Sequence, residues 1–229
     1  MTGYIRQFKE GYMEITWLGH SAVKIKGTKT VYIDPFLTGN PKAATHPDKI
    51  DEADVVIVTH YHGDHLGDSF AICKKTGATL VGIHEVAVDA EGEGIQAEGM
   101  NIGGTIDVKG VTVHMVHALH SAEKGDPAGV VIELDGKTIY HAGDTGLTYD
   151  MKLIGEFFSP DLSFLPIGDR YTMGINSAAR ALDFINTKKV VPIHYGTFPI
   201  VNTDPYAFKE KVGEKAEVII LDPGGSFSL

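Results

Sequence analysis

Short runs of β-branched and apolar residues recur along the chain and are joined by polar turn sequences. Such runs predict β-strands. The dipeptide Asp135-Gly136 separates two of them and predicts a tight hairpin, because a type I′ turn needs a positive φ at both central residues. Glycine-containing turns at 26–28 and 109–110 predict two further hairpins. The predicted strands cover residues 13–18, 22–25, 30–33, 55–59, 111–116, 130–134, 138–141 and 190–193.

The hairpins gather in the first part of the chain, whereas predicted helices and strands alternate in the second part. This mixture favours an α/β protein in which two sheets pack together with helices outside, over one doubly wound parallel sheet. Asn176 is a candidate N-cap, and Pro205 suits a first helical turn after Asp204. Residues 76–108 contain six acidic residues and no Lys or Arg, and we interpret them mainly as an exposed acidic stretch. The predicted helices cover residues 68–75, 84–91, 151–158, 176–185 and 205–212.

Composition limits the class of protein. With 229 residues, of which 43% are hydrophobic, we expect one domain over residues 1–229 with a substantial core. Residues 1–12 lack a signal-peptide core and no apolar run approaches the roughly 18 residues of a membrane span, so we expect a cytoplasmic chain without a membrane partner. A net charge of −10 argues against nucleic acid as a partner. Nothing in the sequence decides whether the chain forms a homo-oligomer.

The 11 histidines are the unusual count, and the densest group follows the predicted strand 55–59. Residues two apart in an extended chain share a face, so His60 and His62 could chelate one ion together. Asp64 and His65 follow where the chain turns at Gly63, and they could face a second ion. Imidazole and carboxylate are suitable donors for a borderline divalent metal. Four candidate ligands within six residues therefore predict a metal site.

Three further candidate ligands follow predicted strands at their carboxyl ends, where loops can converge on one edge of a sheet. They are His120, Asp144 and His194. His117 competes with His120 for the place of the third histidine, because both follow the strand 111–116. His114 lies inside that strand, where a packing or surface role is more typical.

The complete set, His60-x-His62-x-Asp64-His65 followed by His120, Asp144 and His194, resembles the ligand set of the metallo-β-lactamase superfamily. Four further blocks resemble the small metal-dependent hydrolases related to the ascorbate-phosphate lactonases. They are WLGHS at 17–21, IDPF at 33–36, HAGDT at 141–145 and LPIG at 165–168. The resemblance covers nearly the whole chain and implies a four-layer αββα sandwich, the metallo-β-lactamase fold, with two metal ions at one edge between the sheets.

The resemblance also implies how the ligands divide between the two ions. Asp144 would bridge them, and the family pattern of His-Ser at the end of the loop favours His120 over His117. Zn is the expected metal, while Mn, Fe, Co or Ni also suit a His/Asp set. The first ion would be held by His60, His62 and His120, and the second by Asp64, His65 and His194.

Such a site implies a metal-dependent hydrolase. Two ions that share a water lower its pKa towards ~7, and the resulting hydroxide could attack a small ester, lactone or phosphoester substrate. Asp64 would orient this hydroxide and shuttle its proton. The alternatives are a metallo-nuclease or phosphodiesterase of the same superfamily, and a metal-dependent binding or sensing module. The candidate supporting or substrate residues are His20, Asp34, His141, Tyr195 and Arg170.

Overall fold

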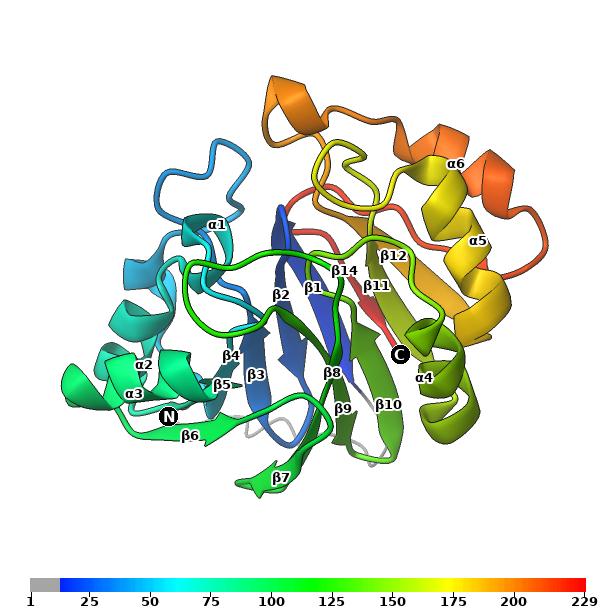
Figure 1. Cartoon of the computed structure of the whole chain (residues 1–229). Coiled ribbons are helices and arrows are strands. Elements are labelled where there is room, and N and C mark those ends of the chain that lie inside the picture. The colour runs from blue at the N-terminus through cyan, green and yellow to red at the C-terminus, as the bar shows by residue number, and fades with distance from the viewer. Residues whose placement is uncertain (1–12) are drawn as a thin grey trace, which may run out of the picture.

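The protein is built from two β-sheets stacked face to face, with helices on both outer faces (Figure 1). The computed structural model describes residues 13–229. Residues 1–12, where we expect no signal-peptide core, lie outside the described residues. Within the described part, no helix is long and apolar enough to cross a membrane. The predicted four-layer αββα sandwich is confirmed.

The first sheet joins an antiparallel half to a parallel half. In the described residues its order is β14 (Ser226–Ser228), β1 (Glu14–Gly19), β2 (Ala22–Lys26), β3 (Thr30–Ile33), β4 (Val55–Ile57), β5 (Thr79–Ile83) and β6 (Ala97–Met100). Strands β14 to β3 pair antiparallel, and β3 to β6 pair parallel. Parallel neighbours need a crossover connection. Here α2 (Ser69–Thr76) and α3 (His84–Gly92) supply two of them.

The second sheet repeats this design. Its order in the described residues is β13 (Glu217–Val218), β12 (Lys189–Ile193), β11 (Leu162–Pro166), β10 (Lys137–His141), β9 (Ala128–Leu134), β8 (Val111–His117) and β7 (Thr105–Val108). Strands β7 to β10 pair antiparallel, and β10 to β13 pair parallel. The crossovers are α4 (Asp150–Phe158), α5 (Ile175–Ile185) and α6 (Pro205–Val212). Short helical turns α1 (Gly63–Leu66), η1 (Pro47–Lys49) and η2 (Pro199–Val201) lie in loops.

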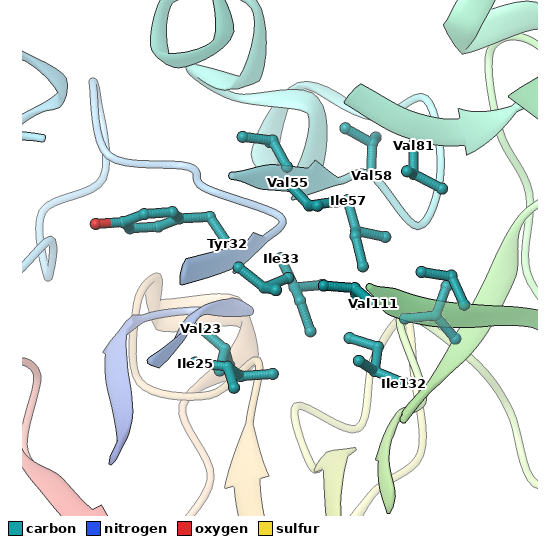
Figure 2. Close-up of a cluster of buried hydrophobic side chains, with 14 of the residues drawn as sticks. Val23, Ile25, Tyr32, Ile33, Val55, Ile57, Val58, Val81, Val111 and Ile132 are labelled. Atoms are coloured by element: carbon teal, nitrogen blue, oxygen red, sulfur yellow. The ribbon is translucent and has the colours of Figure 1, made fainter. Parts of the chain in front are cut away.

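Buried aliphatic side chains hold the two sheets together. Figure 2 shows Ile33 and Ile57 of the first sheet close to Val111 and Ile132 of the second, and all four are fully buried. Burying one such side chain contributes roughly 1.5–3 kcal/mol relative to leaving it in water. A second apolar cluster lies between the outer face of the second sheet and α4, α5 and α6. The sandwich is therefore a rigid support for the loops at its edges.

All three predicted hairpins are confirmed, as β2–β3, β7–β8 and β9–β10. Asp135 and Gly136 have φ values of 52° and 73°, as the type I′ turn requires. The eight predicted strands and five predicted helices are present, with ends that differ by a residue or two. Asp204 caps α6 by accepting a hydrogen bond from the Tyr206 amide at 2.9 Å.

Two interpretations were wrong. Residues 76–108 are not mainly an exposed stretch, because they contain the fully buried strand β5 and the packed helix α3, whose acidic side chains face outward. The acidic composition concealed a short apolar run at 79–83. Asn176 is not an N-cap, because α5 begins one residue earlier and its cap is Gly174, whose amide donates to the Ser177 hydroxyl at 3.0 Å.

The packing of α4 on α5 makes a stability prediction. A Cβ added to Gly155 of α4 would lie 2.6 Å from the carbonyl oxygen of Ile185 and would also overlap that of Phe184. Since these are backbone atoms, Gly155→Ala must push the helices apart, and we expect a loss of about 1–3 kcal/mol in the free energy of unfolding. Urea denaturation measures this. Gly92→Ala, in α3 with no atom within 4 Å, is the matched control and should cost nothing. Equal stability of the two variants would contradict this account of the helix contact.

Candidate active site

The candidate ligands meet because strands of both sheets end at the same edge of the sandwich. The segment from His60 to His65 follows β4 and includes α1. Asp144 follows β10, and His194 follows β12 directly. His120 lies in the loop after β8. Carboxyl ends of parallel strands are common positions for functional loops, and here they face one another across the two sheets.

One group of three histidines lies on the side of β4 and the loop after β8. In His60, His62 and His120, one ring nitrogen of each lies within 4.8 Å of the others. Nε2 of His60 is 3.0 Å from Nδ1 of His62, and the His120 ring lies 5.2 Å from that of His60. This is the set that the family resemblance gives to the first ion.

A second group contains the ligands expected for the second ion together with His20. Donor atoms of Asp64, His65, His194 and His20 also lie within 4.8 Å of one another. Nε2 of His194 is 3.9 Å from Oδ2 of Asp64, and the rings of His65 and His194 are stacked at 5.7 Å.

Asp144 lies between the two groups and contacts both. Its carboxylate oxygens are 3.6 Å from Nε2 of His120, 3.3 Å from Nε2 of His65 and 3.0 Å from Nε2 of His194. The residue is only 3% exposed. This is the position that a ligand shared by two ions would need.

Asp34 orients the rings of His65 and His60, the first directly and the second through Thr59. Its Oδ2 accepts hydrogen bonds from Nδ1 of His65 at 2.8 Å and from the Thr59 hydroxyl, and its Oδ1 accepts from the Thr59 amide. The Thr59 hydroxyl gives its one proton to Asp34, so it accepts from Nδ1 of His60 at 3.0 Å. Both rings therefore present Nε2 to the site. Sequence reasoning missed Thr59, whose position just before His60 was the available signal.

His20 supports Asp64. A carboxylate only accepts hydrogen bonds, so the 3.1 Å contact places the proton of His20 on Nε2. Nδ1 of His20 then accepts from the Thr197 hydroxyl at 2.9 Å. Burial lowers the pKa of His20 to about 4, so the ring is neutral at pH 7. With Nε2 committed to Asp64 and Nδ1 to Thr197, His20 acts as a support for a ligand.

The electrostatics of the site favour added positive charge. Burial lowers the pKa of His60 to about 2, and the neighbouring histidines act in the same direction. Burial also acts to lower the pKa of His65, yet the carboxylates of Asp144 and Asp34 raise it well above its ordinary value. Nε2 of His65 and Oδ1 of Asp144 are buried and face each other at 3.3 Å, and neither makes a regular hydrogen bond among the described residues. The neutral ring of His60 and the buried carboxylate of Asp144 thus both favour positive charge at the centre of the site.

The structure separates the competing histidines. Nδ1 of His117 is 3.2 Å from a carboxylate oxygen of Asp150, and its half-exposed side chain lies outside both groups. His114 is hydrogen-bonded to Thr105 and Glu133 on the sheet surface. Of the three, His120 is the one that joins the cluster.

Of the other predicted supporting or substrate residues, His141 lies behind the site, as expected of a supporting residue, whereas Tyr195 and Arg170 lie outside it. His141 contacts the Ser21 carbonyl at 3.0 Å and accepts from the Gly143 amide, so it holds the loop that carries Asp144. Tyr195 stacks on Trp17 and lines a separate cavity. Arg170 lies beside the ring of Tyr171 and does not line the cavity over the candidate ligands.

A cavity of about 440 Å³ opens over the two groups. Its floor includes His20, His62, Asp64, His120, Asp144 and His194. The rest of the lining comes from loops, and apart from Gly63 and Ser121 sequence reasoning did not single out its residues, because loop residues carry no periodic signal. These residues are Gly63, Ser121, Glu123, Tyr171, Phe198, Ile200 and Val201.

Comparisons with known proteins identify the family of the chain. The family model described as the β-lactamase superfamily domain matches residues 29–195. A UPF0173 metal-dependent hydrolase of Methanopyrus kandleri is 53% identical, covering 94% of this chain and 99% of the relative. Another, from Methanosarcina barkeri, is 46% identical over 95% of this chain and 99% of its own length.

The structural comparison points the same way. The structure of a metallo hydrolase from the archaeon Ignicoccus hospitalis superimposes with a TM-score of 0.90 at 39% identity, covering 95% of this chain and 98% of the other. The chain therefore belongs to the β-lactamase superfamily and, within it, to the UPF0173 family of metal-dependent hydrolases.

Proposed function

We propose that this metal-dependent hydrolase holds two divalent ions and cleaves a small ester, lactone or phosphoester. The observation that carries the proposal is the meeting of two donor groups at one buried carboxylate, that of Asp144, beneath an open cavity. Two-metal hydrolytic sites are built in this way, with two sets of ligands around shared oxygen donors.

The residues fit two divalent ions. The donors are imidazoles and carboxylates, which suit Zn first, and also Mn, Fe, Co or Ni. Asp34 and Thr59 fix the rings of His65 and His60 so that Nε2 faces inward, as supporting partners of metal-binding histidines commonly do. The first ion would be held by His60, His62 and His120, the second by Asp64, His65 and His194, and Asp144 would contact both.

When bound, such ions supply an acidified water and polarise the carbonyl or phosphoryl oxygen. The chain supplies the proton transfer. Burial acts to raise the pKa of Asp64, but the hydrogen bond from His20 and the charge interactions with His65 and His20 together outweigh it, and the pKa lies below its ordinary value. Asp64 is therefore ionised at pH 7. Oδ2, the oxygen nearer His194, accepts from His20 and would also contact the ion, so the other oxygen can accept the proton of the attacking water and pass it to the leaving oxygen.

A substrate panel tests the proposed function. Metal-loaded protein should hydrolyse members of a set of small esters, lactones and phosphodiesters, lose that activity with EDTA and regain it when the metal is restored. Absence of turnover with metal fully loaded would contradict the proposal and favour a binding or sensing module.

Replacing the proposed proton acceptor should affect the rate more than the fold. In Asp64→Asn the side chain keeps its size but cannot take a proton, so we expect kcat to fall about 10²–10⁴-fold at saturating metal. Steady-state kinetics on metal-saturated protein measure this, with bound metal determined in parallel. Asp126→Asn, at an exposed position outside the cavity, is the control and should keep the wild-type rate. A metal-loaded Asp64→Asn protein with normal kcat would show that another group moves the proton.

Removing the supporting carboxylate should weaken metal binding. Asn tolerates the left-handed backbone of Asp34, whose φ is 46°, so Asp34→Asn should fold while losing the charge behind His65. We expect metal affinity to fall about 10–100-fold, measured by competition with a chromogenic chelator. Asp51→Asn removes an exposed partner of Lys75 and should leave the affinity unchanged. Equal affinities for wild type and Asp34→Asn would refute the supporting role.

A further inference from the structure

Within residues 13–229, the cavity over the candidate ligands is lined, away from its floor, by an acidic side chain and by no basic one. Among the described residues that line it, none is Lys or Arg. Apart from the proposed ligands Asp64 and Asp144, Glu123 is the residue of the lining that carries a full charge. An anionic group placed away from the ions would thus meet a carboxylate and no cation.

In the loop that carries Glu123, the next residue, Lys124, points away from the cavity. Lys124 forms an ion pair with Asp89 of α3, and its ammonium lies 4.9 Å from the ring centre of Tyr61. The Glu123 amide donates to the Tyr61 carbonyl at 3.2 Å. No ion pair of Glu123 is found within residues 13–229. The loop therefore leaves the carboxylate at the cavity and turns the ammonium away from it.

The loop that carries Glu123 also packs closely against the end of β5. A Cβ added to Gly125 would lie 2.8 Å from Cγ2 of Ile83, next to the start of α3. The Ala128 amide at the end of the loop donates to the Thr59 carbonyl at 3.1 Å. Because both ends of this segment are held, the fold keeps the backbone at Glu123 beside the cavity.

Another part of the lining is apolar and open to solvent. Tyr171 is 55% exposed and Ile200 is 46% exposed. Phe198 lies edge-on to the ring of His20 with centroids 5.9 Å apart. Exposed apolar side chains at the mouth of a polar cavity are typical contacts for the apolar part of a ligand.

We infer that the cavity takes a carboxylic ester or lactone whose apolar part lies against Phe198 and Ile200 and whose far end carries a cation that pairs with Glu123. This inference rests on the proposed function and names its substrate class. In the reaction, water adds to the acyl carbon and the acyl C–O bond breaks, giving a carboxylic acid and an alcohol from an ester, or one hydroxy acid from a lactone. Asp64 takes the water proton and returns it to the leaving oxygen.

Matched substrates test the inference. We would compare chromogenic esters of equal acyl-chain length that end in methyl, trimethylammonium or carboxylate, using zinc-loaded protein at low salt. The ratio of kcat/KM for the cationic ester to that for the anionic ester should be about 10. Glu123 attracts the first and repels the second, and solvent partly screens both interactions. Added salt should reduce this ratio.

Variants of the loop separate a local contact from the charge of the whole protein. Glu123→Gln should bring the ratio close to unity, and Glu123→Lys should reverse it. Asp126→Lys makes the same change in net charge three residues away on the same loop, outside the lining, and should keep the wild-type ratio.

Three results would overturn the inference. The first is a wild-type ratio of one or below, and the second is a ratio that Glu123→Gln and Glu123→Lys leave unchanged. The third is a shift in Asp126→Lys as large as that in Glu123→Lys, which would indicate a long-range field. In each of these three results the esters are still hydrolysed, so the proposed function would stand. Failure to hydrolyse any ester, lactone or phosphodiester would instead remove the proposed function and this inference with it.

Discussion

The buried carboxylate of Asp144 is the interaction on which the functional architecture depends. A charge that is 3% exposed is costly to bury unless it is compensated, and here the compensating groups come from three different loops. His65 reaches it from the first sheet, while His120 and His194 reach it from the second. The contact therefore connects the two sheets at the edge where their strands end. Positive charge beside Asp144, on a histidine or on a bound ion, therefore also stabilises the arrangement in which the loops of the two sheets face each other.

Three residues at the same edge have a strained backbone. His20, Asp34 and His194 have φ values of 56°, 46° and 54°, in the left-handed region that non-glycine residues rarely adopt. Such conformations cost of order 1–3 kcal/mol each and persist only where the surroundings enforce them. The buried aliphatic layer between the sheets supplies that support. The two sheets are thus a stable frame that holds a few unfavourable residues in the geometry the site needs.

Much of the fold and of the site was predictable because its signals are local. The hairpin at Asp135-Gly136 follows from turn chemistry, and His60 to His65 form one dense group after one buried strand. Asp144 and His194 each follow a strand, which suffices to place them at an edge. The choice between His120 and His117 depended on family resemblance, because residues three apart at the end of a strand give no clear facing direction. The structure shows His117 turned outward to Asp150.

The unpredicted part depends on tertiary contacts. Thr59 gains its role only when Asp34, distant in sequence, packs beside it. Tyr195 is adjacent to His194, yet its ring stacks on Trp17 and faces a different cavity. Glu123, Phe198 and Ile200 lie in loops whose course no periodicity encodes. The buried strand β5 was overlooked because acidic residues around it dominated the local composition.

We propose that the two donor groups sharing Asp144 hold two ions. The most direct test of this proposal is the metal-to-protein ratio, measured by elemental analysis of protein saturated with zinc and then freed of loosely bound metal by gel filtration. We expect two zinc ions per chain. A saturated protein that retains one ion per chain, or none, would contradict the proposal.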